Sequence, residues 1–208
     1  MIKNIIFDLG DIFIDIDEKQ AQKELKKLGL NKFTDEMLEV NLLFEKGLIS
    51  TKDFLKFYRK QFSAKSEEDL IKIWNSILID FPIHRLLFIE KIQNKVKLFL
   101  LSNTNELHIN HFKEQVGYDF YSRFYNCFEK VYYSNEIKLR KPDPEVFQFI
   151  LNENDLNSNE TLFVDDKVEN TDSAKILGIH IWKLDPIAED IIDLFDKFPL
   201  LENNGVNI

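Results

Sequence analysis

The chain has almost no cysteine: Cys127 is the only one among 208 residues. An intrachain disulfide or a cysteine-rich zinc site therefore cannot form, and we expect Cys127 to behave as a small apolar residue. Long apolar runs are also missing, since no stretch approaches the roughly 18 residues that cross a bilayer. No charged-then-apolar leader precedes the first predicted strand. The expectation is a cytoplasmic protein that does not enter a membrane.

Positive charge is scarce as well. The sequence has 27 Lys and Arg residues against 36 Asp and Glu residues, which gives a formal net charge of -9. Nucleic acids and anionic membrane surfaces bind clustered cations, so neither is expected as a partner. A phosphate group bound by this protein must instead meet local positive charge, from a divalent cation or one or two lysines. The oligomeric state is left open by the sequence.

The region between residues 18 and 82 has helical composition throughout. Helices are expected over 18–25, 35–45 and 66–79, and a capping signature at 50–53 precedes another. Roughly 65 residues between two strands is far more than a crossover connection needs. The sequence therefore predicts a small all-helical cap, residues 18–82, inserted after the first strand of a core formed by residues 1–17 and 83–208.

Strand and helix patterns alternate after Pro82. Strands are expected over 96–101, near 131, over 161–164 and over 180–184, with helices over 84–93, 105–115, 142–153, 168–177 and 187–198. This alternation is typical of an α/β protein. It predicts a Rossmann-like parallel sheet that is covered by helices on both faces.

Polar side chains follow the apolar stretches at four points in the chain. Asp8 follows the first strand, Ser102 the second, Lys141 comes after the third, and Asp165 with Asp166 follows the fourth. Because the carboxyl ends of parallel strands meet at one edge of the sheet, these side chains are expected to converge. A carboxylate, a hydroxyl, a lysine and paired carboxylates together form a metal-assisted phosphate site.

Asp8 is the candidate nucleophile of that site. Attack by its carboxylate on phosphorus makes an aspartyl-phosphate, and the reaction needs charge neutralised on the transferring group. Mg²⁺ does this with oxygen ligands, and its expected protein ligands are Asp8, the backbone carbonyl of Gly10, and a carboxylate from Asp165 or Asp166. Adjacent acidic side chains at a strand end cost energy unless a cation shares them.

The phosphate itself is expected to contact the second and third of these segments. Ser102 is expected to open a helix, so that its hydroxyl and the following amide, that of Asn103, bind an anionic oxygen. Lys141 is the cation expected between nucleophile and phosphate. Taken singly, Ser102 is equally consistent with a helix N-cap and Lys141 with a solvated surface lysine, and only the combination favours a site.

Order and spacing give the chain a resemblance to the haloacid dehalogenase superfamily. It is similar within that superfamily to the small sugar-phosphate phosphatases, a subgroup that includes a bacterial glucose-1-phosphate phosphatase and carries a helical cap of the C1 type. Four segments in order carry the resemblance over almost the whole chain: Asp8-Leu9-Gly10, Ser102-Asn103-Thr104-Asn105, Arg140-Lys141-Pro142-Asp143-Pro144 and Asp165-Asp166-Lys167-Val168-Glu169-Asn170.

The resemblance implies a role for each matching side chain. Asp8 attacks phosphorus, Ser102 hydrogen-bonds the phosphoryl oxygens, and Lys141 steadies nucleophile and phosphate. Asp166 binds Mg²⁺ directly, and Asp165 is a second ligand or acts through water.

Two positions depart from the family pattern. Gly10 stands where many members carry an aspartate that serves as general acid and base, so no side chain there can protonate the leaving oxygen. Asn170 stands where many members carry a carboxylate, and it is expected only to orient a water or Lys141. Asp11 is a weak substitute for the missing acid, because the turn is expected to aim it elsewhere.

The sequence thus predicts a magnesium-dependent phosphatase that acts on a small phosphorylated metabolite, with a sugar phosphate favoured. The cap is expected to select the substrate, through contacts at Phe44, Glu45, Lys46 or Trp74, although helix packing explains these residues equally well. Carbon–halogen cleavage, phosphomutase activity and a receiver-like signalling role fit the motifs less well. One alternative stays open, a catalytically weak or inactive module of the same fold that binds phosphate or a partner.

Overall fold

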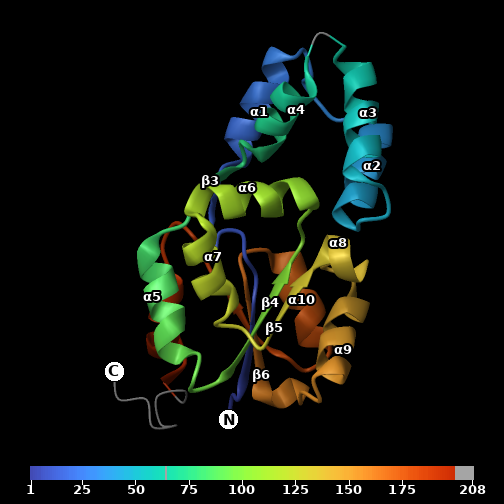
Figure 1. Ribbon diagram of the computed structural model, residues 1–208. Coiled ribbons are helices and arrows are strands. Elements are labelled where there is room, and N and C mark those ends of the chain that lie inside the picture. Colours follow the sequence, from blue (N-terminus) through green and yellow to red (C-terminus); the bar gives the residue numbers. More distant parts are fainter. Residues whose placement is uncertain (64, 200–208) are drawn as a thin grey trace.

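A computed structural model describes residues 1–63 and 65–199 (Figure 1). Its main sheet is five-stranded and parallel. In spatial order its strands are β5 (Lys130–Tyr133), β4 (Lys97–Ser102), β1 (Asn4–Phe7), β6 (Thr161–Asp165) and β7 (His180–Lys183). Because β1 is central, its carboxyl end lies between the ends of β4 and β6. The predicted α/β fold with a Rossmann-like parallel sheet is confirmed.

Helices cover both faces of this sheet, as the alternating burial of β1 requires. Ile5 and Phe7 point to one face and Ile6 to the other. The first face packs against α5 (Ile83–Ile92), α6 (Glu106–Val116), α7 (Tyr118–Tyr125) and α11 (Leu194–Lys197). The second face packs against α9 (Pro144–Glu153) and α10 (Val168–Ile176). The short helix α8 (Ser134–Ile137) follows β5 directly.

Four further helices lie beyond the carboxyl edge of the sheet and are called the cap helices below (Figure 1). They are α1 (Glu18–Lys27), α2 (Asp35–Glu45), α3 (Thr51–Gln61) and α4 (Glu67–Asn75). Side-chain caps from Asp17, Thr34, Ser50 and Ser66 begin them, each accepting a backbone N–H that the helix leaves free. Aromatic and aliphatic side chains fill the space between them, and Leu107 of α6 joins this cluster from below.

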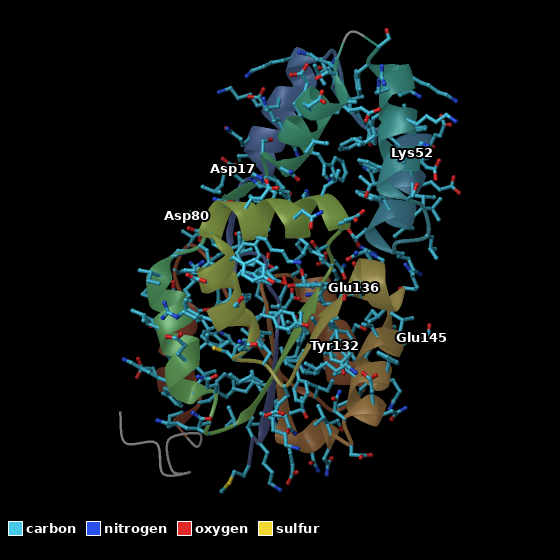
Figure 2. The ribbon with its side chains drawn as sticks, in the orientation of Figure 1. Asp17, Lys52, Asp80, Tyr132, Glu136 and Glu145 are labelled. Carbon is cyan, nitrogen blue, oxygen red and sulfur yellow. The ribbon has the colours of Figure 1, made fainter. Side chains whose placement is uncertain are left out.

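The chain enters and leaves the cap helices through a small antiparallel pair, β2 (Asp15–Ile16) with β3 (Leu78–Asp80). Asp17 and Asp80 mark this base in Figure 2. The expected helix over 66–79 was therefore wrong at its end, since α4 stops at Asn75. Leu78 and Ile79 form strand instead, and Asp17 donates its backbone N–H to the carbonyl of Ile77, in the turn before that strand, at 2.9 Å.

Other differences from the expected elements lie at loops and at the carboxyl end of the chain. α7 and α8 were not predicted, and the expected helix over 187–198 is a 3-10 turn, Ile191–Asp193, followed by α11. Asp190 and Asp193 form a capping box at that turn, so the helical structure begins at Ile191 and not at residue 187 as expected. No helix among the described residues has the length and apolar character needed to span a bilayer.

The end of α2 is fastened to the end of β5 by a fully buried hydroxyl. Ser134 Oγ lies 2.7 Å from the backbone oxygen of Glu45 and 3.0 Å from that of Thr104. It also accepts the backbone N–H of Thr104 at 2.9 Å. Nearby, Lys138 donates to the backbone oxygen of Gly47 at 2.6 Å. These contacts hold the cap helices close to the strand ends.

Candidate active site

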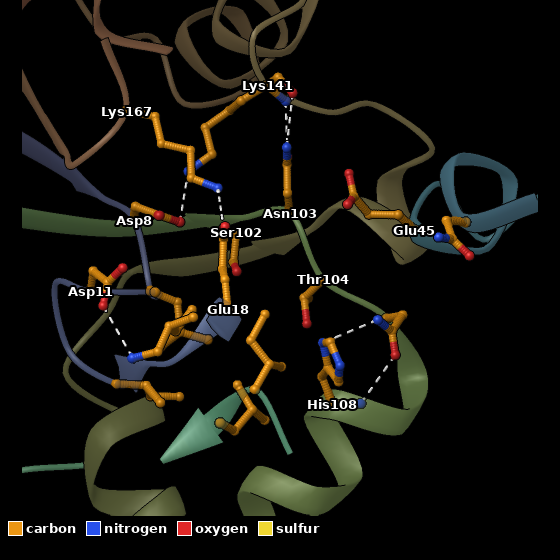
Figure 3. A pocket seen from close by; sticks show the side chains of 18 of the residues that line it. Asp8, Asp11, Glu18, Glu45, Ser102, Asn103, Thr104, His108, Lys141 and Lys167 are labelled. Atoms are coloured by element: carbon orange, nitrogen blue, oxygen red, sulfur yellow. Dashed lines mark hydrogen bonds and ion pairs between the residues drawn. The ribbon is translucent and has the colours of Figure 1, made fainter. Parts of the chain in front are cut away.

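The sequence-predicted residues meet at the carboxyl edge of the sheet (Figure 3). Asp8 follows β1, Ser102 ends β4, and Asp165 ends β6. Lys141 reaches the same point from the loop between α8 and α9. The structure thus brings together side chains from four separate strand-and-loop segments, as parallel strands allow.

A buried ion-pair cluster forms the centre of the site. Lys141 Nζ lies 2.6 Å from Asp8 Oδ1 and 2.7 Å from Asp165 Oδ2, with the lysine side chain only 1% exposed. Burial alone would lower the pKa of Lys141, but the two carboxylates outweigh it and raise that pKa above its ordinary value. Burial raises the pKa of Asp8 to about 7, and Lys141 opposes the rise. Lys141 is therefore a fixed positive charge beside the candidate nucleophile.

Asp165 has its carboxylate oxygens occupied by protein donors. Besides Lys141, the backbone N–H of Lys167 donates to Oδ1 at 2.8 Å, and Asn170 Nδ2 lies 3.0 Å from both oxygens. Asn170 was expected to orient a water or Lys141. In the structure it donates to the Asp165 carboxylate, which in turn accepts from Lys141. The geometry gives Asp165 a positioning function toward the lysine, whereas Asp166 beside it is half-buried and lines the cavity.

The acidic side chains fit a divalent cation. Asp8, Asp165 and Asp166 each offer a ligand atom, and these atoms lie within 4.8 Å of one another. Burial and, to a smaller extent, the neighbouring Asp165 raise the pKa of Asp166 to about 6, so keeping both carboxylates ionised here costs free energy. A hard cation that prefers oxygen ligands, such as Mg²⁺, would remove that cost.

The turn after β1 brings the end of the Ile16 side chain against position 10. A Cβ atom on Gly10 would lie 2.5 Å from Cδ1 of Ile16, so the isoleucine of β2 fills the space that such a side chain would take. Asp11 adopts a positive φ of 55° and accepts the backbone N–H of Ile16 at 3.1 Å. One oxygen of Asp11 thus stabilises this turn, and burial raises the pKa of the group.

Ser102 is the last residue of β4, and Asn103 follows it in the loop before α6. Helix α6 begins at Glu106 with Asn105 as its N-cap, so the expectation that Ser102 opens a helix was wrong. Ser102 is instead the buried last residue of a strand. The Asn103 side chain clamps the backbone of Lys141, accepting from its N–H at 2.9 Å and donating to its carbonyl at 2.8 Å. The side-chain amide of Asn103 therefore positions Lys141. The spacing of the two residues in the sequence did not indicate this contact.

A cavity of about 460 Å³ opens above the ion-pair cluster, between the strand ends and the cap helices. Glu45 and Trp74, two of the cap residues named from the sequence, line it. Phe44 instead stacks on Phe54 at 4.1 Å between ring centroids inside the cap cluster, and Lys46 does not line this cavity. Sequence reasoning missed several polar residues on the walls: Glu18, Gln22, Asn41, His108, Lys167 and Glu169.

His108 joins α6 to the cap helices. Its ring stacks on Trp74 with centroids 5.7 Å apart, and Nε2 donates to the backbone oxygen of Trp74 at 3.2 Å. Nδ1 then accepts from Asn105 Nδ2 at 3.2 Å. With both nitrogens engaged, the ring is neutral, and burial lowers the pKa of His108 to about 4. His108 is therefore built to connect the two parts of the chain rather than to transfer protons.

This neutral histidine predicts a pH-dependent contribution to stability. Between pH 6.5 and 4 the unfolded chain binds a proton at His108 that the folded chain does not, so acidification lowers the free energy of unfolding. The difference in pKa corresponds to about 3 kcal/mol, lost progressively across that window. The measurement is urea unfolding of wild type and His108→Gln at pH 7 and pH 4.5. The pH-dependent loss should be smaller in the variant, and equal losses would contradict the assignment.

Known proteins are similar to this chain in sequence. A family model described as haloacid dehalogenase-like hydrolase matches residues 5–183. A D-ribitol-5-phosphate phosphatase from Bacteroides thetaiotaomicron is 28% identical over 194 residues, covering 88% of this chain and 92% of the relative. A sesquiterpene phosphatase from Aspergillus oryzae is 26% identical, covering 85% of this chain and 87% of that protein.

A solved structure gives the same result for the fold. A haloacid dehalogenase-family enzyme from Bacteroides thetaiotaomicron, crystallised in complex with magnesium and inorganic phosphate, superimposes with a TM-score of 0.81. The two chains are 31% identical, and the match covers 94% of this chain and 100% of the other.

Proposed function

The chain belongs to the haloacid dehalogenase-like hydrolases, and from this premise we propose that it is a sugar- or polyol-phosphate phosphatase that works through an aspartyl-phosphate at Asp8. It is a hydrolase acting on phosphate esters of small molecules, and its cofactor is Mg²⁺. The observation that carries the finer proposal is the buried cluster of Asp8, Lys141 and Asp165, with Asp166 beside it, at the floor of a cavity. That cluster is an anchored nucleophile next to a fixed cation.

Each side chain has a role in the proposed reaction. Asp8 attacks phosphorus, and Lys141 offsets the negative charge that builds on the transferring group. Ser102 donates its hydroxyl to a phosphoryl oxygen. Asn103 and Asp165 keep Lys141 in place through its backbone and its ammonium group.

The metal is proposed to bind through the Asp8 and Asp166 carboxylates and the backbone carbonyl of Gly10, with Asp165 nearby. When bound, Mg²⁺ supplies positive charge that orients the phosphate and neutralises its oxygens. The three carboxylates favour this assignment, because each offers a ligand atom and these atoms lie within 4.8 Å of one another.

Protonation of the leaving oxygen is the step for which this chain has no evident side chain. Gly10 offers none, and Asp11 uses an oxygen to stabilise its own turn. Loss of a general acid typically slows such reactions about 10²- to 10⁴-fold. Turnover should therefore be faster with aryl phosphates, whose leaving groups need little protonation.

Substrate choice is assigned to the cap helices. We propose that residues 18–82 form a cap domain over a catalytic core of residues 1–17 and 83–208, because the cavity wall opposite Asp8 comes from α1, α2 and α4. A small phosphorylated metabolite fits a cavity of about 460 Å³ whose outer wall mixes polar and apolar side chains.

Phosphate release is the direct test. With Mg²⁺, wild type should release phosphate from ribitol 5-phosphate, glucose 1-phosphate and 4-nitrophenyl phosphate, and a chelator should lower the rates at least about 100-fold. Readdition of Mg²⁺ should restore them. The inactive binding module makes the opposite prediction, namely magnesium-dependent phosphate binding by calorimetry without release from any ester. That result would refute the proposed activity.

A further inference from the structure

Two polar side chains of α2 face the cavity one helical turn apart. Asn41 and Glu45 both line it, opposite the strand ends that carry Asp8 and Ser102. Residues separated by four positions lie on the same face of a helix, so the pair presents an amide and a carboxylate side by side. Neither group belongs to the proposed phosphate-binding machinery.

The orientation of the Asn41 amide is fixed by a tyrosine from the next helix. Tyr58 of α3 is 4% exposed and donates its hydroxyl to Asn41 Oδ1 at 2.6 Å. Burial raises the pKa of Tyr58 well above its ordinary value, so the hydroxyl keeps its proton and remains a donor. The amide nitrogen Nδ2 is left without a partner among residues 1–63 and 65–199. Asn41 thus directs two N–H donors away from Tyr58.

Glu45 is held as an acceptor on the same wall. Arg140 Nε donates to Glu45 Oε1 at 2.6 Å, and the backbone oxygen of Glu45 accepts from Ser134. The carboxylate is therefore anchored from both its side chain and its backbone. Since Arg140 immediately precedes Lys141, this acceptor is tied directly to the phosphate end of the cavity.

The chemistry of these groups selects one kind of leaving group. A hydroxyl both donates and accepts, so neighbouring hydroxyls on a carbon chain can satisfy the amide donors and the carboxylate acceptor together. A hydrocarbon leaving group would cover both polar groups without replacing their hydrogen bonds to water, which is unfavourable. A leaving group with its own negative charge would have to compete with Glu45 for Arg140 and with Glu18 for Lys167, because each of these cations on the cavity wall already has a carboxylate partner.

We infer that Asn41 and Glu45 determine specificity by binding hydroxyl groups of the leaving group, and that Tyr58 is the positioning residue that orients Asn41. The substrate class is a phosphate monoester of an uncharged, polyhydroxylated carbon chain. This inference rests on the proposed phosphatase activity and goes further, because it assigns recognition of the part of the substrate that does not react.

The test compares two esters that differ only in their hydroxyls. Initial rates are measured on ribitol 5-phosphate and on pentyl phosphate, which has the same number of carbon atoms. The rate on 4-nitrophenyl phosphate shows whether the phosphate site itself is intact. Asn41→Leu should lower kcat/KM for ribitol 5-phosphate about 10- to 100-fold, mainly through KM, because an unpaired hydroxyl is then buried. Rates on the other two esters should stay within about twofold.

Tyr58→Phe tests the positioning role. It should lower kcat/KM for ribitol 5-phosphate about threefold to tenfold and should add nothing in the Asn41→Leu background, since a residue that acts through another is not additive with it. A merely structural tyrosine would instead lower the rates on all three esters. Asn152→Leu, an exposed helical asparagine of α9 far from the cavity, is the matched control and should leave every rate unchanged.

The possible failures are distinct. If Asn41→Leu leaves ribitol 5-phosphate kinetics within about twofold of wild type, or lowers all three esters equally while thermal unfolding is unchanged, the specificity assignment is overturned and the phosphatase remains. If wild type hydrolyses none of the three esters, including the activated one, the proposed function fails and the inference fails with it.

Discussion

Replacement of Asp8 by asparagine is expected to lower phosphate release by about 10⁴-fold or more on every substrate. Asparagine has nearly the same shape as aspartate, but its neutral amide cannot attack phosphorus to form the covalent intermediate. The carboxylate lies 2.6 Å from Lys141 and follows the central strand, so no neighbouring group can take its position without moving the sheet edge. The measurement is single-turnover phosphate release with saturating Mg²⁺.

The control for this experiment is Asp17→Asn. Asp17 is the N-cap of α1, and asparagine caps a helix as well as aspartate does, so activity should be unchanged. Circular dichroism should show that the Asp8 variant keeps its fold. If Asp8→Asn retained a tenth or more of wild-type activity, Asp8 would not be the nucleophile.

Replacement of Lys141 by methionine should destabilise the fold more than any other single change at the site. Methionine keeps the length of the side chain but leaves Asp8 and Asp165 buried without their cation. Removing one partner of a buried ion pair typically costs about 3–5 kcal/mol in free energy of unfolding. Urea unfolding in the presence of a chelator at neutral pH measures this loss.

The pH dependence of that loss gives a second check. Without Lys141 the two carboxylates can relieve their repulsion only by binding protons, so the penalty should shrink as the pH falls. Lys167→Met is the matched control, because its ammonium group is 3.8 Å from Glu18 and half-exposed, and such pairs contribute about 1 kcal/mol or less. Equal losses for the two variants would show that the Lys141 cluster adds nothing to stability.

The main elements of this fold could be predicted because they depend on local patterns. Burial on both faces makes the strands around Ile6 and Phe163 continuously apolar, and the polar residue that ends each run marks the sheet edge. Asp8, Lys141 and Asp165 therefore come together as expected. Their chemical roles remain proposals, to be tested by the variants above.

The features that the sequence did not reveal depend on contacts between distant segments. Asn103 clamps the backbone of a residue 38 positions away, and Tyr58 orients a side chain on another helix. Nothing in the spacing of such residues differs from ordinary helix or loop composition. The strand Leu78–Asp80 was missed because its apolar residues are equally suited to a helix until Asp15 and Ile16 pair with them.

The Ser134 hydroxyl affects how the cap helices can separate from the sheet. It has one proton but lies within hydrogen-bonding distance of two carbonyl oxygens, those of Glu45 and Thr104. When α2 moves away, the proton can turn to Thr104, so the departure leaves no buried donor unpaired. The enthalpy of that one broken contact is thus recovered by rotation about a single bond, so resistance to separation at this junction comes from the Lys138–Gly47 and Arg140–Glu45 contacts rather than from Ser134.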